Sequence, residues 1–335
     1  MTRPDGQVLE NRAVTDYTAG LWRDRPVPVD EPEPAPEYVY STADLPGGRV
    51  IGARVRGRQH RHQGTNCDDW YEFAHAGPAI CAAVSDGAGS KKLSRIGART
   101  ACRAAAGALE RQLKEALASR PALWDCGALP LTDSRCLEAC GVLAGAVQQA
   151  AREAADAVEA AWRQRSGCPA YAALLGREPR LEDFSGTLLA AVFLPVGGGE
   201  CLAAACQTGD GAIALLDTRD SVPAVKLLGA AEGGAFAGET AFLTSPWIRR
   251  DGALQSRTHV TKCAAGLALL MTDGVADDYF PPQRELPRLY RDLMANGVLG
   301  GAEEGASPGL RLKNWLAGYV ERGSFDDRTL VVVSF

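Results

Sequence analysis

Three aspartates stand at the ends of short apolar runs, where their carboxylates could meet at one edge of a β-sheet. Residues 79–85 lead into Asp86, residues 266–272 lead into Asp273, and Asp326 precedes the run 328–333. Short apolar runs bounded by turn residues are typical of buried strands. Carboxylates gathered at a sheet edge repel one another unless a hard divalent cation neutralises them, and all-oxygen ligands suit Mg²⁺ or Mn²⁺. The sequence therefore predicts a metal site at these strand ends.

The rest of the sequence predicts the elements that position these aspartates. Further strands are expected near residues 50–56, 71–74, 186–193, 200–207 and 212–216. Short glycine-rich turns between several of them are typical of antiparallel neighbours. Helices are expected from about residue 94, and at about 133–165, 283–294 and 307–323. Two blocks of strands separated by long helices predict an α+β fold, with two antiparallel sheets packed face to face and helices outside.

Composition divides the chain into an amino-terminal arm and one folded domain. Residues 1–45 include a proline-alternating acidic stretch at 25–36 that cannot form a helix and has little to bury, so we expect an extended or disordered arm. The domain is expected over 46–335, with a long helical insert at about 111–180. A flap-like loop, rich in small and polar residues, is expected at about 229–258.

Charge and hydropathy exclude some classes of partner. The 335 residues carry a net charge of −5 with no lysine- or arginine-rich block, which argues against nucleic acid. No apolar run reaches the roughly 18 residues of a membrane span, so no membrane partner is expected. The first ten residues lack the apolar centre of a signal peptide, and we expect a cytoplasmic protein. The oligomeric state is open.

The ten cysteines are expected to be reduced and mostly buried, because the chain is long and shows no export signal. Cys136 and Cys140 have the i, i+4 spacing of one helix face, which leaves a zinc site as the alternative.

Six short motifs occur in an order that matches a known family. They are Asn66-Cys67-Asp68-Asp69, Val84-Ser85-Asp86-Gly87-Ala88-Gly89-Ser90, Ser185-Gly186-Thr187-Leu188-Leu189, Gly209-Asp210-Gly211, Met271-Thr272-Asp273-Gly274-Val275 and Asp326-Asp327-Arg328-Thr329-Leu330. With these motifs, the chain from about residue 50 to 335 resembles the metal-dependent protein phosphatases (the PPM family, type 2C serine/threonine phosphatases), in the bacterial branch with a Gly-Ala-Gly-Ser turn. One Asp-Gly pair carries little information because it is a common turn, whereas six motifs in order are specific.

The resemblance implies a four-layer αββα sandwich with two Mn²⁺ or Mg²⁺ ions at one end and a possible third. Asp86 would bridge the two ions, and the Gly87 carbonyl would bind one of them. Asp273 and Asp326 would hold the second ion.

Three further acids take roles by the same resemblance. Asp69 would bind directly or through water, with Asp68 beside it, and Asp210 would be the ligand of a weaker third ion. All of these ligands are oxygen donors, as hard divalent cations prefer.

The implied activity is hydrolysis of phosphoserine and phosphothreonine in a protein that a serine/threonine kinase targets, in bacterial signalling. A metal-bridging water or hydroxide would attack the phosphorus, so no phosphoenzyme would form. The chain also lacks the Asp-x-Asp-x-Thr and Cys-x5-Arg motifs of phosphatases with a protein nucleophile. Two alternatives stay open: a catalytically weak or inactive regulatory module that binds a phosphoprotein, and a small-molecule phosphatase.

Two positions depart from the family pattern. Ala88 stands where many animal members have a histidine, and Gly64 stands where an arginine usually clamps the phosphate. We predict that Arg61 and His60 contact the phosphate instead, because arginine offers a two-pronged donor and a protonated histidine can donate. The alternative for residues 58–62 is a solvated, charged edge of the fold.

Overall fold

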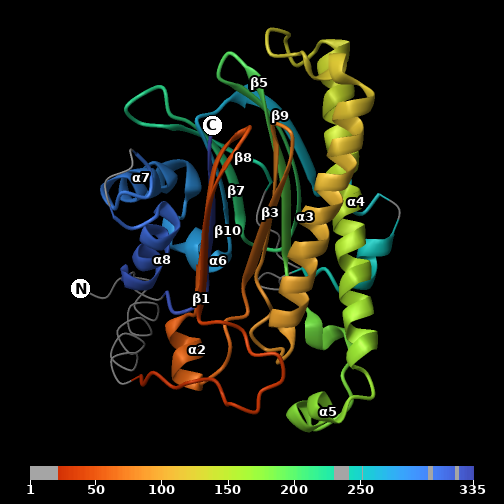
Figure 1. Cartoon of the computed structure of the whole chain (residues 1–335), viewed down its shortest axis with the longest axis vertical. Helices are drawn as coiled ribbons and strands as arrows, with labels where there is room; N and C mark the ends of the chain where they lie inside the picture. Colours follow the sequence, from red (N-terminus) through yellow and green to blue (C-terminus); the bar gives the residue numbers. More distant parts are fainter. Residues whose placement is uncertain (1–21, 230–240, 251, 301–304, 321–323) are drawn as a thin grey trace, which may run out of the picture.

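Two β-sheets pack face to face in the middle of the protein, and helices cover both outer surfaces (Figure 1). The computed structural model describes residues 22–229, 241–250, 252–300, 305–320 and 324–335. Among these residues, no helix combines the length and the apolar character that crossing a bilayer requires.

Sheet A has the spatial order β1-β2-β11-β10-β7-β8, with antiparallel neighbours throughout the described chain. Its strands are β1 (Tyr38–Leu45), β2 (Gly48–Val55), β7 (Ala212–Asp217), β8 (Ala224–Leu227), β10 (Leu267–Met271) and β11 (Arg328–Ser334). The last strand of the sequence, β11, lies between β2 and β10. The end of β10 and the start of β11 therefore reach the same edge of the sheet.

Sheet B has the order β3-β4-β5-β6-β9, also antiparallel within the described residues. Its strands are β3 (Trp70–Ala76), β4 (Ala79–Ser85), β5 (Leu188–Gly197), β6 (Glu200–Thr208) and β9 (Thr258–Ala264). The start of β3, the end of β4, the start of β5 and the end of β6 are paired in register. These four strand ends also share one edge.

Long helices form the outer layers. The helices of the described chain are α2 (Arg58–Gln63), α3 (Ser94–Ser119), α4 (Ser134–Arg165), α5 (Pro169–Leu175), α6 (Asp273–Ala276), α7 (Pro282–Ala295) and α8 (Pro308–Gly318), with the 3₁₀ turns η1 (Pro121–Trp124), η2 (Leu181–Phe184), η3 (Pro246–Arg249) and η4 (Asp277–Tyr279). Small residues let α3 approach its neighbours closely, since a Cβ at Gly97 would lie 1.9 Å from the Phe184 carbonyl oxygen. The helix expected at about 307–323 ends earlier, at Gly318.

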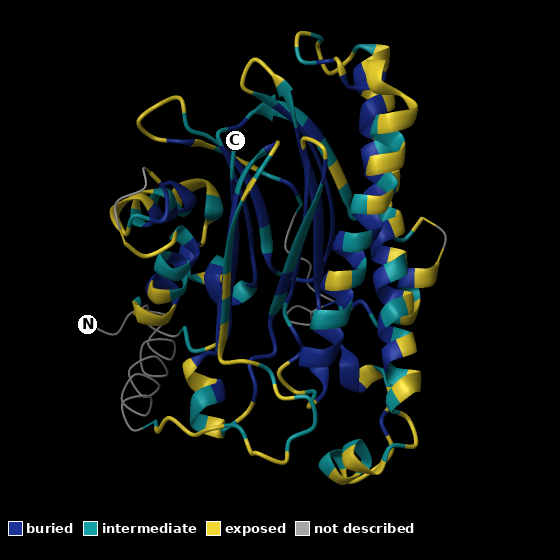
Figure 2. Cartoon of the chain, viewed as in Figure 1, coloured by how far each residue is buried: buried dark blue, intermediate teal, exposed yellow. Residues whose placement is uncertain are grey.

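Three apolar cores lie between the four layers. One core joins α3 and α4 to sheet B, a second fills the space between the sheets, and a third joins sheet A to α7 and α8. The strands at the centre of the molecule are accordingly buried along most of their length (Figure 2). This arrangement confirms the predicted α+β fold and its αββα layers. The thiol of Cys136 packs against backbone carbonyl oxygens of Cys126 and Leu129, at 3.7 and 3.8 Å.

The amino-terminal arm was expected over residues 1–45, but residues 38–45 belong to the folded domain. Tyr38–Leu45 forms β1, because its backbone pairs with all of β2. Residues 1–21 lie outside the described residues. The region 111–180 contains the end of α3 together with α4 and α5, and α4 contributes to the same core as α3. Of the expected loop at 229–258, residues 230–240 and 251 lie outside the described residues, and η3 occupies part of the remainder.

Glu33 ties the segment before β1 to the helical layer. Its carboxylate accepts hydrogen bonds from Arg165 (2.6 and 2.9 Å) and Arg99 (2.7 Å), and also from the Tyr171 hydroxyl. The hydrogen bond from Arg165 is the largest influence on the carboxylate and outweighs burial, so the pKa of Glu33 falls to about 2. Glu33 has a φ of 50°, a left-handed conformation that costs a non-glycine residue about 1 kcal/mol. The ion pairs hold the segment in place against this cost.

We expect Glu33→Gln to lower the free energy of unfolding at pH 7 by about 1–2 kcal/mol, because charge-assisted hydrogen bonds are lost. The value is discounted for solvent screening, since 27% of the side-chain surface is exposed. The folded-state pKa lies below the unfolded one, so this stabilisation is complete above about pH 4.5 and is lost as the pH falls towards about 2. Urea unfolding at pH 7 and pH 3 measures both effects.

The matched control is Glu110→Gln, which removes an exposed i, i+4 pair with Lys114. It should change stability by less than about 0.5 kcal/mol. A Glu33→Gln protein as stable as this control at pH 7 would contradict the role given to Glu33.

Candidate metal centre

The predicted aspartates gather at one edge of the sandwich, where strands of both sheets end. Asp69 precedes β3 and Asp86 follows β4 in sheet B, whereas Asp273 follows β10 and Asp326 precedes β11 in sheet A. Asp210 lies in the connection from β6 to β7, which passes from sheet B to sheet A. The packing of one sheet on the other therefore assembles carboxylates that are far apart in the sequence.

Asp86, Asp210 and Asp273 form a tight group, with one carboxylate oxygen from each within 4.8 Å of the others. Burial, followed by the charges of Asp326 and Asp210, raises the pKa of Asp273 to about 7. Burial and the charges of Asp69 and Asp273 raise the pKa of Asp86 well above its ordinary value. A divalent cation would oppose both shifts, because it stabilises the ionised carboxylates.

The turn at Asp86 is fixed by the start of β5. The Asp86 amide donates to Oγ1 of Thr187 at 2.9 Å, and the Thr187 amide donates to the Asp86 carbonyl at 2.8 Å. Gly87 forms a β-bridge with Gly186. A Cβ on Gly87 would lie 2.6 Å from the Asp68 carbonyl oxygen, so the turn has no room for a side chain. The Asp86 carboxylate and the Gly87 backbone are thus held in one place.

Asp69 provides a test of whether the site fits a cation. Its Oδ2 atom accepts hydrogen bonds from the hydroxyls of Thr272 (2.9 Å) and Thr329 (2.6 Å). Its Oδ1 atom is buried and finds no hydrogen-bond donor within the described residues. A buried carboxylate oxygen without a donor is costly, and a cation or a cation-bound water would satisfy it. The donor set therefore fits Mg²⁺ or Mn²⁺.

Asp327 has a structural role that the sequence did not indicate. Its two carboxylate oxygens accept the backbone amides of Gly57 and Asp68, each at 2.6 Å. These bonds fix the backbone that leads into Asp69. Asp68 is itself buried beside Asp327, and burial followed by the Asp327 charge raises the pKa of Asp68 to about 7.

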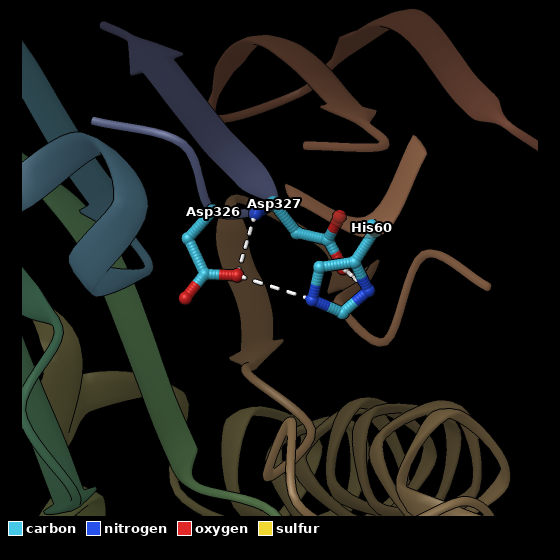
Figure 3. Close-up of side chains that lie close together, drawn as sticks. All are labelled: His60, Asp326 and Asp327. Atoms are coloured by element: carbon cyan, nitrogen blue, oxygen red, sulfur yellow. Dashed lines mark hydrogen bonds and ion pairs between the residues drawn. The ribbon is translucent and has the colours of Figure 1, made fainter. Parts of the chain in front are cut away.

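His60 lies between Asp326 and Asp327 (Figure 3). Its Nε2 atom is 3.3 Å from Asp326 Oδ1, and its Nδ1 atom is 2.6 Å from the Asn66 carbonyl oxygen. Because that oxygen can only accept, Nδ1 carries a proton. Burial alone would lower the pKa of His60, but the hydrogen bond to Asp326 and the charges of Asp327 and Asp68 raise it to about 10. Both ring nitrogens face protein groups, so this cluster is a hydrogen-bond network and not a further metal site.

The contact with His60 keeps Asp326 ionised. Burial would raise the pKa of Asp326, but the hydrogen bond from His60 outweighs it and the pKa is lowered. The Asp326 side chain keeps 56% of its surface exposed. It is therefore a charged carboxylate that is open on one side, as a metal ligand must be.

Arg61 lies on α2 close to Asp326. The two residues line a cavity of about 30 Å³ together with Arg58. The Arg61 guanidinium is 4.0 Å from the carboxylate of Asp24. Its contact with phosphate, like that of His60, stays a prediction.

The support residues Thr272, Thr329 and Asp327 were not predicted as part of the site. The spacing of Asp327 and Thr329 indicates that their side chains share one side of an extended segment, but it does not indicate which groups they contact. Nothing in the sequence indicates that Asp326 and Asp327 have different roles.

Comparison with known proteins identifies the family. The family model described as protein phosphatase 2C matches residues 56–317. The structure of serine-threonine phosphatase 2C from Toxoplasma gondii is 14% identical, with a TM-score of 0.53, and the match covers 90% of this chain and 100% of that one. Serine/threonine phosphatase Stp1 from Staphylococcus aureus is 12% identical, with a TM-score of 0.42 and coverage of 91% and 97%. A search of curated proteins finds no match.

The family match spans most of the chain, and the chain therefore belongs to the protein phosphatase 2C family. Members of this family are metal-dependent phosphatases, and the enzyme class of this chain is protein serine/threonine phosphatase. The match confirms the family predicted from the six motifs. The Toxoplasma structure supports the sandwich fold.

We expect Mn²⁺ to raise the thermal stability of the protein, because a ligand that binds the folded state alone stabilises it by about 2.7 kcal/mol at 100 times its Kd. For a chain of this size, the midpoint should rise by roughly 4 °C. Asp86→Asn should remove most of this rise, while the exposed Asp156→Asn on α4 should retain it. Scanning calorimetry in Mn²⁺ and in chelator measures the difference, and an unchanged rise in Asp86→Asn would contradict the placement of the site.

Proposed function

We propose that this protein removes phosphate from phosphoserine and phosphothreonine side chains of a partner protein by direct attack of water, without a phosphorylated enzyme intermediate. The observation that carries this proposal is the group of Asp86, Asp210 and Asp273 within 4.8 Å at the shared edge of the two sheets. When bound, two Mn²⁺ or Mg²⁺ ions supply activation of water and neutralisation of charge on the phosphoryl group. The partner is expected to be the target of a serine/threonine kinase in the cytoplasm.

The proposed ligand roles are those that the family resemblance implies, and the grouping of Asp86 with Asp273 supports them. Asp86 and the Gly87 carbonyl are proposed to hold the first ion, and Asp86, Asp273 and Asp326 the second. Burial and the charges of neighbouring carboxylates raise the pKa values of Asp86 and Asp273, and a bound dication would favour their ionised forms.

The other acids are proposed to bind at or next to the two ions. The free Oδ1 of Asp69 suits an ion or its water, with Asp68 beside it. Asp210 is proposed as ligand of the third ion.

The hydroxyl groups near the cluster support hydrolysis without a protein nucleophile. Thr272 and Thr329 donate to Asp69. The Ser85 hydroxyl donates to the Thr187 carbonyl at 2.6 Å, and Thr187 Oγ1 accepts the Asp86 amide. These hydroxyls hold the backbone and the carboxylates in place, so each of them has a structural role and none is assigned as a nucleophile.

The purified protein with Mn²⁺ should hydrolyse p-nitrophenyl phosphate and phosphothreonine peptides, and Asp86→Asn or Asp273→Asn should lower kcat at least ~1,000-fold, because charge stabilisation at the phosphoryl group is lost. Steady-state release of phosphate measures this. A ³²P-labelled substrate should leave no covalent label on the protein.

The control is Asp156→Asn, an exposed acid on α4 that should leave kcat within about twofold. Full activity in Asp86→Asn would refute the proposed site. If sugar phosphates or nucleotides were hydrolysed with a higher kcat/KM than any phosphopeptide, the substrate would be a small molecule and not a protein.

The contacts of His60 also support a positioning role, in which it orients Asp326 instead of binding phosphate. His60→Asn removes the Nε2 contact and should weaken Mn²⁺ binding about 10-fold, as is typical when a group that orients a metal ligand is lost. At saturating Mn²⁺, KM for p-nitrophenyl phosphate should stay within about twofold. Calorimetric titration and steady-state kinetics measure the two quantities.

His62→Asn on the same helix is the control, since His62 stacks on Trp22 and does not face the carboxylates. Unchanged Mn²⁺ affinity with a raised KM in His60→Asn would instead support the predicted contact between His60 and phosphate.

A further inference from the structure

A largely apolar cavity lies beside the metal centre, between sheet A and α7. It encloses about 360 Å³, within the range of ligand-binding pockets. We call it the β7–α7 pocket, and its large apolar side chains are Ile213, Leu227, Met271, Tyr279, Phe280 and Leu286. Its polar lining comes from Gln207, Asp210, Asp277 and Gln283.

The β7–α7 pocket shares one residue, Asp210, with the metal centre. This residue lines the cavity and also belongs to the carboxylate group with Asp86 and Asp273. The Gln207 amide fixes the loop that carries Asp210, since Nε2 donates to the carbonyl oxygens of Gly209 (3.1 Å) and Gly211 (2.8 Å). The wall shared by pocket and centre is therefore held in one conformation.

An aromatic side chain stands at the rim of the pocket. Phe280 is 74% exposed, the largest exposure of an aromatic residue in the described chain, although it lines an apolar cavity. Pro281 and Pro282 follow it and restrict the backbone at the rim. An exposed aromatic side chain on a restricted backbone beside a cavity is typical of residues that contact a binding partner.

We propose that the β7–α7 pocket binds an apolar side chain of the substrate protein, one or two residues away from the phosphorylated residue. The inference rests on the proposed function and specifies its substrate class. An extended peptide advances about 3.3–3.6 Å per residue, so a pocket that shares a wall residue with the metal centre is reached by a near neighbour of the phosphorylated residue.

Charge disfavours an acidic occupant, and the apolar walls favour an apolar one. Asp210 and Asp277 lie at the pocket, so an acidic neighbour of the phosphorylated residue would meet like charge, whereas an apolar neighbour would displace water from the apolar walls. The protein should therefore select phosphorylated segments that carry leucine, isoleucine, methionine or phenylalanine close to the phosphate.

The test uses phosphothreonine peptides that differ at one position, with leucine or serine at −2, −1, +1 or +2. At one of these positions, leucine should raise kcat/KM about 10-fold over serine, the scale of discrimination that an apolar pocket provides. The same ratio should appear in the Kd measured by fluorescence anisotropy for the Asp273→Asn protein with Mn²⁺, because its expected loss of kcat leaves the peptide intact during the measurement.

Two variants of the pocket connect this preference to the structure. Phe280→Ala removes the exposed rim and should reduce the leucine preference to below about threefold, while hydrolysis of p-nitrophenyl phosphate stays within about twofold. Leu227→Trp fills the cavity from β8 and should have the same effect. Val222→Ala is the control, because Val222 is 66% exposed and lies outside the pocket lining.

Each result decides a separate point. Equal kcat/KM and equal Kd for leucine and serine peptides would refute the proposal that the pocket binds an apolar substrate side chain, and would leave the phosphatase proposal intact. A leucine preference that survives in Phe280→Ala and in Leu227→Trp would also refute the proposal for the pocket. Leucine-selective binding that depends on Phe280, without hydrolysis of any phosphopeptide, would support the pocket and refute the proposed function.

Discussion

Repulsion between partly buried carboxylates is the interaction that the rest of this structure has to accommodate. Asp86, Asp210 and Asp273 come within 4.8 Å although two of them have pKa values raised by burial and by one another. Such a group would separate if its backbone could move. The paired strand ends of two sheets, packed on a continuous apolar core, prevent that movement. Because the sandwich is rigid, these carboxylates stay close together, and a bound cation would stabilise this edge.

In each of two pairs of neighbouring aspartates, the two residues have different roles. In the pair at 326–327, both carboxylate oxygens of Asp327 accept backbone amides, whereas Asp326 is partly exposed and is kept ionised by His60. In the pair at 68–69, the Asp68 amide is the one bound by Asp327, while Asp69 is held by two threonine hydroxyls through one oxygen. Each pair therefore combines an anchor to the fold with a carboxylate for the site.

The sequence predicted the layers and the family, because apolar runs ending in Asp-Gly and helical periodicity are local signals. Asp86 and Asp273 were predicted to meet for the same reason, and they do. β1 was missed because an edge strand beside a proline-rich stretch depends on its pairing with β2. The partners of His60 and the β7–α7 pocket were also beyond reach, since they arise where segments distant in sequence pack together.

The position of β11 has a consequence for where this protein can be cut. The family match covers residues 56–317, whereas β1, β2 and β11 lie outside that range. A fragment with those limits would keep only β10, β7 and β8 of sheet A, and β10 would become an edge strand with unpaired backbone groups. Unpaired edge strands favour self-association. The strands outside the family match are thus needed to cover β10, and the segment after the match also carries Asp326.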